Sequence, residues 1–121
     1  MEAKHYKREE LQLRADVPGA EMWAVALEKT QLTYFEVKPN SRFEKHSHES
    51  EQITMVLSGE LIFEVNEKNV RVGEGEVIAI PANVPHAVFT KELPVKAVDA
   101  WSPIMEKYYL AQQAAGGDAV R

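Results

Sequence analysis

The chain has 121 residues, of which 45% are hydrophobic and 27% are charged. This length fits one domain, and the composition can bury a hydrophobic core, which argues against disorder. A net charge of −5, from 14 Lys and Arg against 19 Asp and Glu, speaks against a nucleic-acid partner, which would require a basic face. The chain has no cysteine, so disulfides, thiolate metal sites and cysteine nucleophiles are excluded.

The first ten residues, MEAKHYKREE, are polar and charged. They lack the apolar stretch of a secretory signal peptide, and no segment approaches the roughly 20 apolar residues of a membrane-spanning helix. We therefore expect a cytoplasmic protein without a membrane partner.

Short β-prone runs separated by turn residues fill most of the chain. Each run is rich in β-branched or aromatic residues, and breaks such as KPNS, SGE and PANVP separate them. The predicted strands span residues 22–27, 32–37, 42–48, 52–57, 61–65, 69–72, 76–80, 86–90 and 95–101. Many short strands without helical periods between them predict an all-β sandwich or barrel.

The C-terminal flank has a different pattern, SPIMEKYYLAQQAAGG, which predicts a short helix. Ser102 suits the N-cap, Pro103 suits the first helical position, and Gly116-Gly117 ends the helix.

We expect a single domain over residues 1–121. Its core spans about 22–101, preceded by an N-terminal arm, 1–20, and followed by the C-terminal helix and tail, 102–121.

Three of the four histidines fall at the starts or ends of predicted strands. His46 and His48 are one residue apart, so a regular strand points both side chains to one face. Taken alone, such a pair is more typical of a surface strand than of a metal site. His86 lies beside turn residues at the start of a later strand, where the mouth of a barrel would gather all three imidazoles.

These spacings resemble the first of two motifs of the cupin family. That motif has a glycine, five residues, H-x-H, three or four residues, a glutamate, six residues and a glycine. The corresponding residues here are Asn40, His46, His48, Gln52 and Gly59.

The second cupin motif has a glycine, five residues, P-x-G, two residues, a histidine, three residues and an asparagine. The corresponding residues here are Gly75, Pro81, Asn83, His86 and Thr90. Asn83 in place of glycine is a mild change, because asparagine is the next best residue for a left-handed turn.

Over residues 32–101 the chain thus resembles a small single-domain cupin. The resemblance implies an all-β, RmlC-like jelly-roll, which is a double-stranded β-helix barrel, and a homodimer. The N-terminal arm is a candidate exchanged strand, because residues 1–20 are too short to fold on their own. It also implies one divalent transition metal ion. The implied metal ligands are His46, His48, Gln52 and His86. Nitrogen and oxygen ligands suit Ni, Mn, Fe, Zn or Cu, and the sequence does not choose among them.

Gln52 stands where many cupins have glutamate, and the adjacent Glu51 is the alternative ligand. Three imidazoles and an amide leave a divalent ion its full charge. Such a site would bind metal less tightly than a carboxylate site and would attract an anionic substrate.

The strand at 95–101 offers two further candidates, Asp99 and Trp101, on one face. Inside an apolar barrel Asp99 would be a general acid or base, whereas at the rim it would bond to backbone; both readings stay open. Trp101 either walls a substrate pocket or packs in the core. Arg42 shares parity with His46, so a regular strand would turn it inward to clamp a substrate carboxylate, unless a bulge intervenes.

The end of that strand resembles small cupins that open unsaturated uronates from pectin and alginate breakdown. Those proteins carry Asp-x-aromatic-Ser-Pro followed by an arginine, and DAWSP matches it at Asp99, Trp101, Ser102 and Pro103. Met105 falls where the arginine would be, which removes a partner for a uronate carboxylate.

The favoured function is a metal-dependent isomerase- or lyase-type enzyme acting on a small anionic sugar acid or keto/enol metabolite. The alternatives are a cupin dioxygenase, a non-catalytic cupin that binds a small molecule or a metal, and a cupin with a vestigial, metal-free site.

Overall fold

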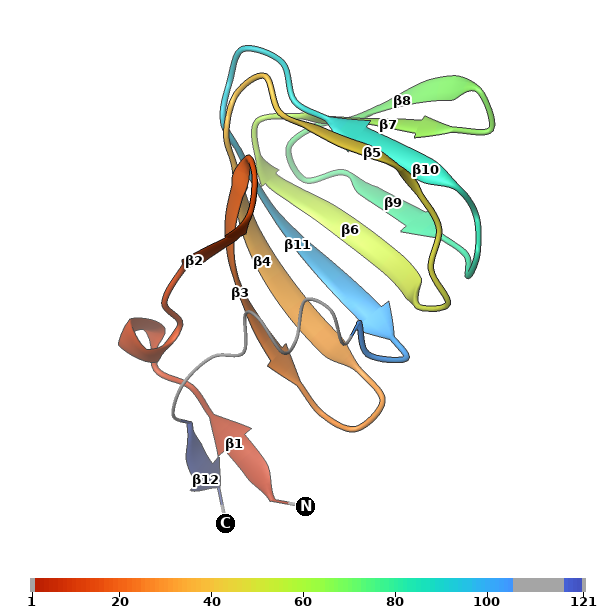
Figure 1. The fold of residues 1–121 in the computed structure, drawn as a ribbon. Coiled ribbons are helices and arrows are strands. Elements are labelled where there is room, and N and C mark those ends of the chain that lie inside the picture. The colour runs from red at the N-terminus through yellow and green to blue at the C-terminus, as the bar shows by residue number, and fades with distance from the viewer. Residues whose placement is uncertain (1, 106–116, 121) are drawn as a thin grey trace.

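The computed structural model describes residues 2–105 and 117–120, which form mainly antiparallel β-sheets (Figure 1). A six-stranded sheet has the order β2-β3-β4-β11-β6-β9 and a four-stranded sheet has the order β5-β10-β7-β8. The six-stranded sheet contains β2 (Arg14–Val17), β3 (Ala20–Ala26), β4 (Gln31–Val37), β11 (Val95–Ser102), β6 (Glu51–Ser58) and β9 (Val77–Ile80). The four-stranded sheet contains β5 (Arg42–His46), β10 (His86–Phe89), β7 (Leu61–Val65) and β8 (Lys68–Val72).

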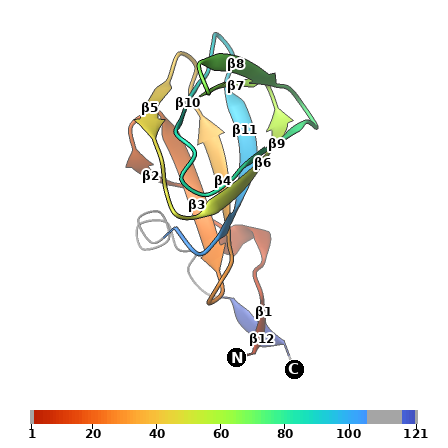
Figure 2. The same cartoon turned by 90° about the vertical axis from the view of Figure 1, so that its right-hand side faces the viewer.

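The two sheets face each other and enclose the barrel interior (Figure 2). All nine predicted strands are present, each within two residues of its predicted ends. Four short elements of the arm and tail were not predicted: β1 (Ala3–His5), the 3-10 helix η1 (Arg8–Glu10), β2 and β12 (Asp118–Val120). β1 and β12 pair with each other away from the barrel.

The barrel core is clearest in the strict alternation along β6 and β11. On β6 the side chains of Thr54 and Val56 are buried, whereas Met55 between them is exposed. On β11 the inward face begins with Val95 and Ala97, each 1% exposed. This period of two buries one face of both strands, and the two facing sheets confirm the predicted jelly-roll class.

Two asparagines make turns that elsewhere need glycine. Asn83 has φ 62° and Asn40 has φ 54°, both in the left-handed region. The Asn83 N–H also donates to the backbone oxygen of His48 at 2.8 Å, so this turn ties the loop before β10 to the loop after β5.

The predicted C-terminal helix does not begin at Ser102. Ser102 ends β11, where it pairs with Glu51, and residues 103–105 are irregular. The rest of the predicted helix, residues 106–116, lies outside the described residues. No helix in the described part of the chain is long and apolar enough to cross a membrane.

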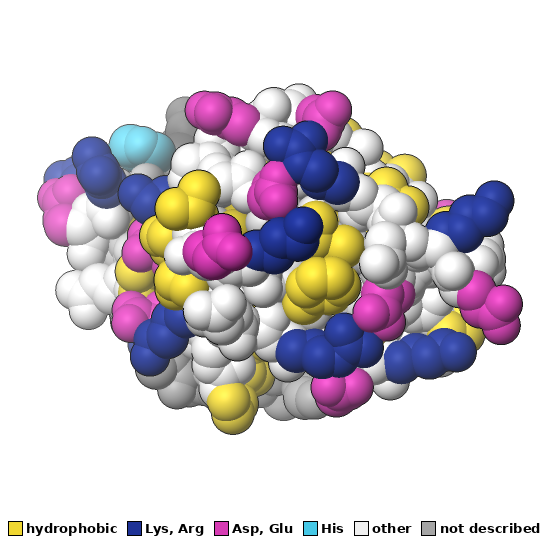
Figure 3. Space-filling view, turned by 90° about the horizontal axis from the view of Figure 1, so that it is seen from above, with side chains coloured by type: hydrophobic (Ala, Val, Ile, Leu, Met, Phe, Trp, Pro, Cys, Tyr) yellow, Lys and Arg dark blue, Asp and Glu magenta, His cyan; other side chains and the backbone are white. Residues whose placement is uncertain are grey.

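Charges of both signs are interspersed on the face seen from above (Figure 3). Among the described residues on that face, basic side chains alternate with acidic ones around a central apolar area, so they form no continuous basic surface there.

Candidate functional site

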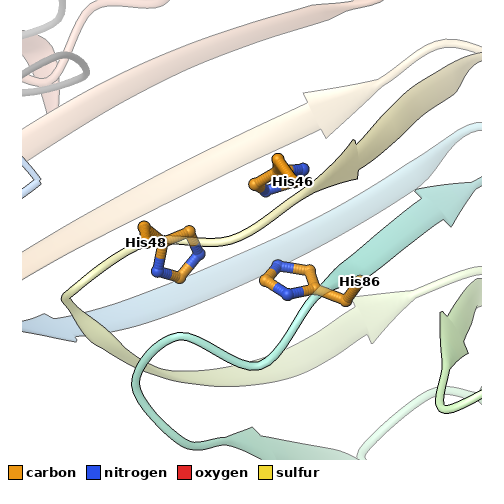
Figure 4. Close-up of side chains that lie close together, drawn as sticks. All are labelled: His46, His48 and His86. Carbon is orange, nitrogen blue, oxygen red and sulfur yellow. The ribbon is translucent and has the colours of Figure 1, made fainter.

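Three imidazoles converge inside one end of the barrel (Figure 4). His46 ends β5, His48 lies in the loop that follows, and His86 begins β10 directly opposite His46 in the strand pairing. One ring nitrogen from each residue lies within 4.8 Å of the others. Strand pairing and one short loop therefore bring together residues that are up to 40 positions apart in the sequence.

The three rings share the same orientation toward the backbone. In each, Nδ1 lies 2.7–2.9 Å from a backbone oxygen: that of Glu44 for His46, Ser50 for His48 and Val84 for His86. Because a carbonyl only accepts, each Nδ1 must carry the ring proton, which leaves the Nε2 lone pair available. Metal-binding histidines are commonly held in this way.

His86 is the most deeply placed of the three, at 1% exposed. Burial lowers its pKa, and the neighbouring His46 and His48 lower it further. The neutral imidazole that metal binding requires is therefore favoured.

Gln52 completes the group from β6. Its side chain is buried, and its Oε1 lies 3.1 Å from Nε2 of His48. With the His48 proton on Nδ1, two lone pairs face each other across this distance, an arrangement that a shared cation stabilises. Glu51 is exposed on the opposite side of β6, so Gln52 is the residue that faces the imidazoles.

The four residues fit a divalent transition metal ion. Three imidazole nitrogens and an amide oxygen are donors of the kind that such ions accept. All four ligands would be neutral, so the ion would keep its +2 charge for a substrate.

Asp99 lies inside the barrel on β11 and is 7% exposed. The hydroxyl of Thr54 donates to its Oδ1 at 2.5 Å. Burial raises the pKa of Asp99 from 3.8 to about 7, and the Thr54 hydrogen bond opposes that rise. The carboxyl lines the same cavity as His46 and His86, so of its two readings the interior one matches the structure.

Trp101 serves as packing and as cavity wall together. Its ring is 4% exposed, and its Nε1 donates to the hydroxyl of Thr33 at 3.0 Å. The same ring meets His48 edge-on, with centroids 5.3 Å apart. The indole thus fixes the position of one imidazole.

Arg42 does not turn inward, so that expectation is wrong. β5 has an irregularity between Phe43 and His46, where three steps along β5 match two along β10. This bulge reverses the parity of the strand, so Phe43 lines the cavity while Arg42 lies outside it. The guanidinium there pairs with Glu44 and Glu64, each at 3.0 Å.

The cavity beside the imidazoles has a volume of about 70 Å³. No Lys or Arg lines it within the described ranges. Met105 does not line it either, and its backbone N–H donates to the side-chain oxygen of Gln31. Ten of its fifteen lining residues are apolar: Val17, Met22, Phe35, Val37, Phe43, Leu61, Phe63, Val88, Ala97 and Trp101. The pocket thus combines one polar end with an apolar remainder.

Sequence reasoning missed the polar residues that support this site. Thr54 bonds both Gln52 and Asp99, and Thr33 accepts from Gln31 and Trp101. The signal was present, because Thr54 has the parity of Gln52 and Thr33 lies opposite Asp99 in the sheet.

Comparison with solved structures supports the fold. The chain is similar to KdgF from Halomonas sp., with a TM-score of 0.77 and 20% identity, covering 84% of this chain and 96% of that one. It is also similar to an RmlC-like cupin from Shewanella frigidimarina NCIMB 400, with a TM-score of 0.80 and 16% identity, covering 88% of this chain and 97% of that one.

The curated relatives share a single name. An acireductone dioxygenase from Tuber melanosporum is 32% identical over 82 residues, which is 58% of this chain and 47% of the relative. The chain spans about half the length or less of the curated relatives that it matches. The Cupin domain family matches residues 33–101, more than half of the chain. The chain therefore belongs to the cupin family.

Proposed function

We propose that this protein is a metal-dependent enzyme acting on a small anionic keto or enol metabolite, with isomerase- or lyase-type chemistry. One observation carries the proposal: the clustered imidazoles and the oxygen of Gln52 lie beside a cavity that also holds the buried carboxyl of Asp99. Of these ligands, His46, His86 and Gln52 line the cavity, and His48 lies against both His86 and Gln52. Perturbed carboxyls beside potential metal ligands are typical of catalytic sites.

A divalent ion held by these four residues would supply Lewis-acid polarisation of a substrate oxygen. Asp99 would then move the proton. A carboxyl with a pKa of about 7 is suited to accept and return a proton near neutral pH. It would take a proton from the carbon next to a carbonyl and deliver it to another atom of the same enolate. Trp101 would bound the substrate on the side of His48.

The cavity lining favours a keto/enol substrate with an apolar remainder over a polyhydroxylated sugar acid. A sugar acid needs several polar partners and a cation for its carboxylate, whereas ten of the fifteen lining residues are apolar and Arg42 lies outside. The negative charge of the substrate would be matched by the metal. This weighs against the uronate reaction, as does Met105 in place of arginine.

A dioxygenase is the second candidate. It is favoured by the name shared by the matched relatives, acireductone dioxygenase, although the chain spans only part of their length. The same ligands with iron would serve that reaction. A non-catalytic cupin would instead bind such molecules and release them unchanged.

A homodimer is part of the proposal, because the outer face of the six-stranded sheet is unusually apolar. Ile53, Met55 and Leu57 of β6 are 40–52% exposed, and Val77 lies opposite Met55 on β9 at 51%. Leu32 of β4 continues this surface beyond β11 at 41%. Contiguous exposed apolar residues mark interaction surfaces, and a second copy of this chain would cover them symmetrically.

The function is tested with metal-loaded protein in D₂O. Small 2-keto acids and ene-diols, with apolar or with polyhydroxylated remainders, are followed by proton NMR, with oxygen consumption recorded in parallel. We expect deuterium exchange or isomerisation of an apolar keto/enol compound, lost in Asp99→Asn although that variant still binds metal. Oxygen consumption would instead select the dioxygenase. Binding without any product in the whole panel would contradict the enzyme reading.

A further inference from the structure

A chain of hydrogen bonds crosses the inner face of the six-stranded sheet behind the candidate metal site. Asp99 of β11 pairs in register with Thr54 of β6, and Gln52 precedes Thr54 by one inward-facing position. The Thr54 hydroxyl is 2.5 Å from Asp99 Oδ1 and 2.9 Å from the amide nitrogen of Gln52. Both Thr54, at 1% exposed, and Gln52, at 5%, are shielded from water.

The direction of these bonds follows from counting protons. A hydroxyl has one proton to donate, and an ionised Asp99 carboxylate, the form present above its pKa, can only accept. Thr54 therefore donates its proton to Asp99. Thr54 must then accept from its other neighbour, and the only Gln52 atom that can donate is Nε2. The amide is thereby turned so that its oxygen faces Nε2 of His48, as observed at 3.1 Å.

The reverse orientation of the amide would disable the site. It would point an N–H₂ group at the imidazole lone pairs, and an amide nitrogen with its two protons is not a metal ligand. A glutamine ligand therefore depends on something that selects one of its two faces. A glutamate ligand would not depend on such a selection, because both atoms that its carboxylate can present to the ion are oxygens.

We propose that Thr54 is a positioning residue for the metal: held by Asp99, it selects the orientation in which Gln52 presents its oxygen to the ion. This inference rests on the proposed metal site. Asp99 thus supports metal binding through two hydrogen bonds, in addition to any contact with substrate. Partners of this kind commonly change metal affinity by about 10- to 100-fold when removed.

The test is titration of the full-length, metal-stripped protein with Co²⁺ at pH 8.5, above the pKa of Asp99. Binding and the visible Co²⁺ spectrum are recorded for Thr54→Val and for Thr54→Ser, which keeps the hydroxyl. Both substitutions are made in two backgrounds, the native Gln52 and Gln52→Glu. Thermal unfolding first establishes that each variant is folded, and Thr54→Ala replaces Thr54→Val if the latter is not.

With Gln52 we expect Thr54→Val to weaken Co²⁺ binding about tenfold or more and to change the spectrum, whereas Thr54→Ser stays within about threefold. In the Gln52→Glu background, loss of the Thr54 hydroxyl should weaken Co²⁺ binding less than about threefold, because either oxygen of a carboxylate can bind the ion.

Two results would overturn the inference while leaving the metal site intact: native affinity in Thr54→Val, or an equal loss in both backgrounds, which would mark a merely structural role. Failure of the native protein to bind Co²⁺ at all would refute the proposed metal site, and the inference with it.

Discussion

Replacing Asp99 by asparagine should stabilise the metal-free protein at neutral and alkaline pH. Burial raises the pKa of this carboxyl from 3.8 to about 7, so folding favours the protonated form. Between these two pH values the native state binds a proton that the unfolded state has lost. The free energy of unfolding therefore falls as pH rises from about 4 to about 7.

The size of the effect follows from the two pKa values. At about 1.4 kcal/mol per pH unit, the difference amounts to about 4 kcal/mol above pH 7. At pH 5 the loss in the free energy of unfolding caused by Asp99 is about 1.7 kcal/mol. This loss therefore grows by about 2.5 kcal/mol between pH 5 and pH 8. Asparagine has nearly the same shape and cannot ionise, so Asp99→Asn should escape this loss.

Urea unfolding of the metal-free native protein and of Asp99→Asn at pH 5 and pH 8 measures how the difference in their free energies of unfolding increases with pH. The comparison cancels the histidines and other groups that both proteins share. A stability gap that is the same at pH 5 and pH 8 would show that Asp99 does not resist ionisation. The reasoning that makes it a proton carrier near neutral pH would then be wrong.

Three further outcomes are expected. Metal content after dialysis should be full at pH 8 and fall below about pH 6, because imidazoles bind metal in their neutral form. Burial lowers the pKa of His86 and so favours its neutral form, and full occupancy at pH 4.5 would count against a three-histidine site. Asn83→Val should lower the free energy of unfolding by about 1–2 kcal/mol, because the backbone at this residue has φ 62°. Asn83→Gly should stay near the native value in the same urea experiment, and equal stabilities of the two variants would contradict the strain at this turn. Met55→Asp should convert a dimer, of twice the 13.7 kDa chain mass by light scattering, into a folded monomer, and a monomeric native protein would refute the proposed interface.

The strands and the histidine cluster were accessible from the sequence because they depend on local patterns. Alternating apolar residues and turn-forming breaks located nine of the ten strands of the two barrel sheets, and the tenth, β2, lies in the N-terminal arm. The left-handed backbone at Asn83 could be expected from its place in a glycine position. Alternation on β11 likewise placed Asp99 and Trp101 on the face of Val95 and Ala97.

What the sequence did not reveal depends on pairing between distant segments. The bulge that turns Arg42 outward lies between Phe43 and His46, where β5 pairs with β10, and no local signal in the sequence marks it. Ser102 has the chemistry of a helix cap, but pairing with Glu51 extends β11 through it. The partnership of β1 with β12 joins the two ends of the chain, which local propensity cannot foresee.

The central claim is that the three imidazoles hold a metal ion, and elemental analysis tests it most directly. Protein purified without an affinity tag or chelator is compared with His48→Ala, which removes one ligand and leaves the barrel core intact. We predict a near-stoichiometric divalent transition metal in the native protein and its loss in the variant. Absence of metal from both proteins, even after loading with nickel, manganese, iron and zinc, would contradict the account and leave a barrel with a vestigial site.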